Sequence, residues 1–100
     1  MSYAFTYDVP ADAEMYAKIR ALLPAETPPG LISHIVMKQE TGLRYVDVWE
    51  TEAAWRTFMD ETGEPAVEKV LASYGLPHDH TLVKLEEIDV IDVWQPMLVS

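Results

Sequence analysis

The sequence lacks cysteine, clusters of basic residues and long apolar runs. Without cysteine the 100 residues can form no disulfide and offer no thiolate, and a reducing, cytoplasmic setting is expected. Seven Lys and Arg stand against seventeen Asp and Glu, a formal net charge of −10. Such a surface repels phosphate backbones and anionic lipids, so nucleic acids and membranes are not expected partners. No stretch approaches the roughly 20 apolar residues that a membrane-spanning helix needs.

The common catalytic motifs are also missing. The chain has no glycine-rich phosphate loop, no nucleophile elbow and no zinc motif. His78-Asp79-His80 has metal-binding residue types, but a catalytic zinc needs about three protein ligands and no third is evident. We therefore expect a solvated loop there and no metal. Glu86, Glu87 and Asp89 are expected on the exposed side of a strand rather than as a carboxylate pair.

The order of the expected elements predicts an α+β fold in a single domain, 1–100. Apolar spacing, caps and turn residues predict a strand over 3–7, a helix from Pro10 to Pro24, and strands over 31–40 and 43–50. They also predict a helix from Thr51 that is interrupted at 62–63 and restarts at 64–65, and a last strand from about 81. The apolar phase of that strand changes at 86–87, where a β-bulge or bend is expected. The order is that of a ferredoxin-like βαββαβ domain.

The two central strands form a predicted hairpin around Thr41-Gly42, because glycine supplies the positive φ of a tight turn. If these two residues are the loop, His34 lies opposite Trp49 and diagonal to Asp47, with Tyr45 on the same face. The other face is apolar throughout, with Ile35, Met37, Val46 and Val48. Helices cover one face of such a sheet, so the apolar face needs another partner. We expect a two-fold homodimer whose sheets meet face to face as a dimeric α/β barrel.

Three segments carry a family resemblance: Gly30-Leu31-Ile32-Ser33-His34, Gly42-Leu43-Arg44 and the run from Val46 to Trp55. With the element order, they make the chain resemble the dimeric α/β-barrel superfamily, in the branch of the antibiotic-biosynthesis monooxygenase (ABM) domains. The resemblance implies the same fold and dimer, with diverse functions. These include cofactor-independent oxygenation of polycyclic phenols, haem degradation, dehydration and isomerisation. Haem-degrading members carry an asparagine on the first strand and a histidine near the second helix. Segments 3–7 and 51–74 have neither, so no haem or other cofactor is expected.

His34 is the candidate for acid–base chemistry. Imidazole side chains titrate near neutrality, so His34 could remove a proton from a phenol or an enol carbon acid, with Asp47 orienting the ring. Four aromatic side chains are candidates for the walls of a substrate pocket: Tyr45, Trp49, Trp55 and Phe58. The alternative is a half-buried histidine packed on an indole, with the other aromatic rings in the core.

Two classes of function follow. The first is a cofactor-independent monooxygenase acting on a small aromatic or polyketide-like molecule, with His34 as its base. An oxygen-independent isomerase or cyclase would use the same base. The second class is a non-catalytic ligand-binding or dimerisation module. If the His34 row faces the helices it lines a ligand site, whereas on the other face it belongs to the dimer interior.

Overall fold

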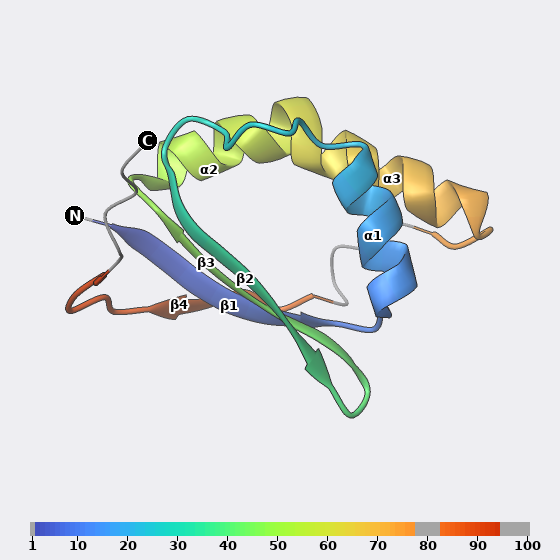
Figure 1. Ribbon diagram of the computed structural model, residues 1–100, viewed down its shortest axis with the longest axis horizontal. Coiled ribbons are helices and arrows are strands. Elements are labelled where there is room, and N and C mark those ends of the chain that lie inside the picture. The colour runs from blue at the N-terminus through green and yellow to red at the C-terminus, as the bar shows by residue number, and fades with distance from the viewer. Residues whose placement is uncertain (1, 78–82, 95–100) are drawn as a thin grey trace.

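A computed structural model describes residues 2–77 and 83–94, and it confirms an α+β, ferredoxin-like arrangement. The elements are β1 (Tyr3–Val9), α1 (Ala13–Ala21), β2 (Leu31–Gln39), β3 (Gly42–Trp49), α2 (Glu52–Phe58), a π-helical turn η1 (Met59–Gly63), α3 (Glu64–Ser73) and β4 (Glu86–Ile88). All strand pairs are antiparallel, in the order β2-β3-β1-β4. Figure 1 shows the three helices gathered on one side of this sheet.

The first two helices begin where a side chain caps them. Thr51 caps α2 as predicted, since its hydroxyl accepts from the Ala54 N–H at 3.1 Å. The predicted start of the first helix at Pro10 is wrong. The carboxylate of Asp12 accepts a hydrogen bond from the Met15 N–H at 2.9 Å. Asp12 is thus the N-cap, and α1 begins at the next residue, Ala13. A side chain that satisfies a free backbone N–H in the first turn stabilises a helix by about 1 kcal/mol.

The interruption predicted at 62–63 corresponds to η1, where the α-helix gives way to a π-helical turn, and α3 begins at Glu64 as predicted. Pro65 cannot donate the backbone hydrogen bond of an α-helix, which accounts for a change of helix type just before it. Gly63 is buried in this turn, and a Cβ there would lie 2.7 Å from the Met59 sulfur and 3.0 Å from Phe58 Cε2. The glycine therefore lets two apolar side chains close over the backbone.

The hairpin register differs from the predicted one. Gln39 pairs with Gly42, so residues 40–41 form the loop and His34 lies opposite Asp47 rather than Trp49. Gly42 has the expected positive φ, +102°, but takes it as the first residue of β3. A β-bulge between Leu31 and Ser33 changes the register at the start of β2. Over 33–39 the displacement of two residues leaves the side chains on their predicted faces, because the side-chain period of a strand is two. It brings the two polar side chains directly opposite each other.

The last strand is shorter than predicted. Within the described residues, β4 pairs with β1 over 86–88 only, and 83–85 has no regular structure. Residues 81–82 lie outside the described part of the chain. The change of apolar phase at 86–87 therefore marks the start of β4 and not a bulge within it, because regular pairing begins there.

The core lies between the sheet and the helices α2 and α3, with Ala66 and Val70 of α3 buried in it. Phe5 and Trp49 are fully buried, and Trp55 packs on Phe5 with ring centroids 4.8 Å apart. The opposite sheet face, which we call the open face, leaves apolar side chains in solvent, with Ile35 49% exposed and Met37 40% exposed. No helix within residues 2–77 and 83–94 is long and apolar enough to cross a membrane.

Candidate functional site

The polar row of the hairpin lies on the helix-covered face. Phe5 on β1 pairs with Asp47 on β3, which in turn pairs with His34 on β2, so the three side chains share one face. Phe5 packs against Trp55 of α2, which identifies that face as the one beneath the helices. The row therefore lies on the helix-covered face and not on the open face, with Asp47 buried and His34 exposed on the edge strand β2.

A buried carboxylate organises this row. Asp47 is 5% exposed, and both of its oxygens are engaged. Oδ1 lies 2.6 Å from His34 Nδ1, and Oδ2 accepts a hydrogen bond from Trp49 Nε1 at 3.1 Å. An ionised carboxylate only accepts hydrogen bonds, so the His34 proton sits on Nδ1. In the neutral ring the lone pair is then on Nε2, which is the acceptor nitrogen. Asp47 fixes both the tautomer and the orientation of the imidazole.

The fourth member of the network is Tyr16, on α1. Its hydroxyl lies 3.0 Å from His34 Nε2 and donates to it, since that nitrogen carries the lone pair. The two rings are near-parallel, 25° apart with centroids separated by 6.2 Å. No sequence signal singles out Tyr16, because in an amphipathic helix it is one more residue beside the apolar stripe. Only the tertiary packing of α1 over β2 brings it to the histidine.

Tyrosine rings surround the imidazole. Tyr45 stands edge-on to both His34 and Tyr16, each with ring centroids 5.7 Å apart, and stacks on Tyr7 at 4.9 Å. Burial, reinforced by the charge of Asp47, raises the pKa of Tyr7 and of Tyr45. Burial also raises the pKa of Tyr16. These hydroxyls therefore stay protonated at neutral pH and are neutral hydrogen-bonding groups around the imidazole.

The structure brings together four of the six predicted site residues: His34, Asp47, Tyr45 and Trp49. Trp49 is wholly buried and reaches the site through its indole N–H. Phe58 packs on the other side of that indole, with ring centroids 5.4 Å apart. Trp55 packs on Phe5 and Tyr3 instead. Phe58 therefore packs against Trp49, whereas Trp55 belongs to the aromatic cluster of Tyr3 and Phe5.

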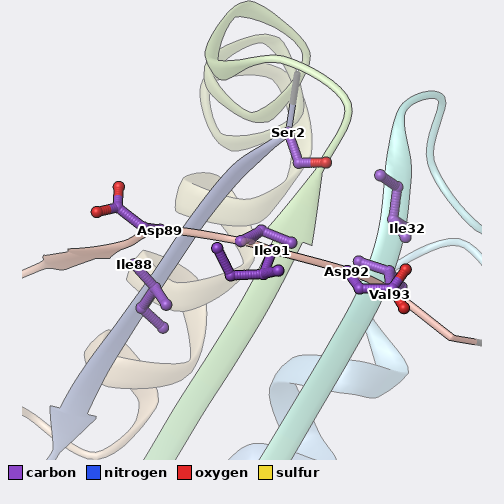
Figure 2. Close-up of a pocket in the computed structure, with 8 residues that line it drawn as sticks. Ser2, Ile32, Ile88, Asp89, Ile91, Asp92 and Val93 are labelled. Carbon is purple, nitrogen blue, oxygen red and sulfur yellow. The ribbon is translucent and has the colours of Figure 1, made fainter.

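Within the part of the chain that the structure describes, metal-ligating side chains do not cluster, and one hollow lies apart from the His34 row. Among residues 2–77 and 83–94, no group of three His, Cys, Asp or Glu side chains could hold a metal ion. The predicted solvated loop 78–80 lies outside that part of the chain. Figure 2 shows a hollow of about 510 Å³ between Ser2, Ile32 and segment 88–93. It lies on the open face, since Ile88 pairs with Ala4, and it contains none of the His34 row.

Comparison with known proteins shows the fold. No family model matches the chain, and no curated protein matches it. A crystal structure of a protein of unknown function from Nitrosomonas europaea has a TM-score of 0.67 and 15% identity, covering 96% of this chain and 95% of its own. The crystal structure of a "putative antibiotic biosynthesis monooxygenase" from Deinococcus radiodurans has a TM-score of 0.53 and 16% identity, covering 97% and 99%. These similarities confirm that the chain has an ABM-like fold.

Proposed function

We propose that this protein is a homodimeric, cofactor-independent monooxygenase in which His34 removes a proton from a small aromatic or polyketide-like molecule. The observation that carries the proposal is the hydrogen bond of 2.6 Å between His34 Nδ1 and the buried carboxylate of Asp47. It supports a base whose acceptor nitrogen points toward α1, where the His34 side chain is 29% exposed. Carboxylate-oriented histidines of this kind serve as general bases on unrelated folds.

The reaction balances without an added reductant. His34 Nε2 takes a proton from an activated CH₂ group, or from the hydroxyl of its phenolic enol tautomer. Either loss gives the same delocalised anion, whose carbon adds to O₂ to form a C–O bond. The imidazolium returns its proton to the peroxide. Loss of water from the hydroperoxide then leaves a ketone, so that CH₂ and O₂ become C=O and H₂O. The substrate supplies all the electrons, and the protein supplies proton transfer and an aromatic enclosure.

The proposal is tested by oxygen uptake on a panel of anthrones and hydroquinones. General-base catalysis typically contributes about 10²- to 10⁴-fold, so we expect His34→Ala to lower kcat by that factor on any substrate found. His78→Ala removes a different imidazole and serves as the matched control. Uptake that is the same in His34→Ala and in the parent protein would remove His34 from the chemistry. Turnover that continues without oxygen would indicate the isomerase or cyclase instead.

The dimer is part of the proposal and rests on the open face. Ile35, Met37 and Ile88 are 39% to 49% exposed there, and a contiguous apolar face is typical of an interaction surface. A second copy would cover it with the same residues, as a two-fold interface requires. Native mass spectrometry gives the subunit number and any bound ligand together. We expect a dimer that Ile35→Asp converts to monomer, and a monomeric parent protein would contradict the barrel.

One observation favours a second candidate function. Both ring nitrogens of His34 already have partners, Asp47 and Tyr16, as in a histidine with a purely structural role. The chain would then be a ligand-binding or dimerisation module without catalysis. A folded, dimeric protein that turns over nothing in the panel, but keeps a copurified ligand by native mass spectrometry, would support this candidate over the enzyme.

A further inference from the structure

We propose that the Tyr16 side chain occupies a phenol-binding site beside His34, and that a phenolic ligand enters by displacing it. The inference deepens the proposed function, because it rests on His34 Nε2 as the reactive atom of the site. It names the ligand class as a phenol with a free hydroxyl. It also assigns Tyr16 as the internal occupant of the site when no ligand is bound.

The surroundings of Tyr16 already match such a ligand. Its hydroxyl lies 3.0 Å from Nε2, its ring lies near-parallel to the imidazole, and Tyr45 meets it edge-on at 80°. Contacts of these two kinds hold an aromatic alcohol: a hydrogen bond at its hydroxyl and an edge-on aromatic neighbour at its ring. A substrate phenol in the same place would have its acidic proton against the nitrogen that accepts it.

Tyr16 can leave without dismantling the base. Asp47 and His34 lie on paired strands, and Trp49 adds its hydrogen bond from the same strand, so the orienting contacts do not involve α1. Helix α1, which the structure describes in full, contains no buried residue. Its link to α3, where Lys18 donates to the Tyr74 hydroxyl at 2.8 Å, also survives a rotation of the Tyr16 side chain.

The acidity of the hydroxyl distinguishes the Tyr16 side chain from a phenolic ligand. Burial raises the pKa of the Tyr16 hydroxyl, so this phenol keeps its proton and only donates a hydrogen bond. A phenol conjugated to a carbonyl group is more acidic and transfers its proton to Nε2 instead. Tyr16 therefore occupies the acceptor nitrogen of His34 without reacting, and gives way to a ligand that can react.

The test uses p-cresol, which is the tyrosine side chain as a free molecule. In Tyr16→Ala the site is empty, and we expect p-cresol to bind at least tenfold more tightly than to the parent protein, because no internal ring competes. The ¹⁵N resonance of His34 Nε2 should shift on binding. Toluene, which lacks the hydroxyl, should not produce this shift. Tyr74→Ala removes a tyrosine from the same helical layer and should bind p-cresol as the parent does.

A second variant, Tyr16→Phe, tests the inference even if Tyr16→Ala does not fold. Tyr16→Phe keeps the ring and loses only the hydrogen bond, so p-cresol affinity should rise by about fivefold, the usual worth of one such bond. Folded variants that bind p-cresol no better than the parent, or that respond equally to toluene, would overturn the inference. Tight p-cresol binding with no turnover of the panel would support the phenol site and reject the oxygenase. Turnover whose KM is indifferent to both Tyr16 substitutions would retain the oxygenase and reject the displaced tyrosine.

Discussion

Replacing Asp47 by asparagine is the substitution that most directly tests the assigned role of the buried carboxylate. Asp47 accepts from two N–H donors, one on each oxygen. Asparagine is nearly isosteric but has a single acceptor oxygen, so its amide N–H₂ must face one of those donors. If the oxygen stays with the buried indole of Trp49, the amide group faces His34 Nδ1. The imidazole then becomes an acceptor at Nδ1 and carries its proton on Nε2.

The cost of this change can be worked from the lost contacts. One charge-assisted hydrogen bond, worth about 1.5–3 kcal/mol, is replaced by a neutral one worth about 1 kcal/mol, and the bond to Trp49 loses its charge assistance as well. We expect the free energy of unfolding to fall by about 2 kcal/mol. Catalysis should suffer more, because a histidine in the wrong tautomer cannot accept the proton. In an analogous triad of another enzyme this change costs about 10⁴-fold in kcat.

Two measurements decide the matter. Urea denaturation gives the loss of stability, and ¹⁵N shifts of the imidazole give the tautomer directly. Asp8→Asn is the matched control, because Asp8 is exposed and pairs with Arg44 at the surface, where such pairs contribute little. If Asp47→Asn keeps the proton on Nδ1 and unfolds at the same urea concentration as the control, Asp47 does not orient the ring.

Two further predictions concern the hairpin and the tyrosines. Gly42→Ala should lower the free energy of unfolding by more than about 2 kcal/mol, because its φ is +102° and the new Cβ would lie 2.3 Å from the Val9 carbonyl oxygen. Gly75→Ala, with φ +72° and nothing within 4 Å, should cost only about 1 kcal/mol in the same urea denaturation, and equal losses would contradict the packing argument. The raised pKa values of Tyr7 and Tyr45 mean that the folded chain holds protons which the unfolded chain releases from about pH 10. The stability from these groups is therefore full below about pH 10 and is lost as pH rises toward the folded pKa values. Ultraviolet titration of the five tyrosines should show two late groups, and a single transition near pH 10 would contradict their burial.

The sequence predicted the order of the elements because the signals for it are local. Strand and helix periods, the Thr51 cap and the positive φ of Gly42 all act within a few residues. The errors arose where two local solutions compete. A loop over 40–41 and a loop over 41–42 both use the same glycine, and only the fit of β3 between two neighbouring strands selects the first.

The site was predictable only in part, for the same reason. The period of two placed His34, Asp47, Tyr45 and Trp49 on one face, and this survived the error in register. The period does not say which face the helices cover. Tyr16 was out of reach of sequence reasoning, because its contact with His34 depends on the angle at which α1 crosses the sheet.

The distribution of polarity over the sheet links the proposed site to the proposed dimer. In a two-layer domain that works alone, the face beneath the helices is apolar and the other face is polar. Here the helix-covered face carries a histidine and a buried aspartate, while the open face exposes Ile35, Met37 and Ile88. Burying Asp47 is tolerable only because both of its oxygens are hydrogen-bonded. The polar pair beneath the helices supports the proposed base in each subunit. The apolar side chains of the open face support the proposed second subunit that covers them.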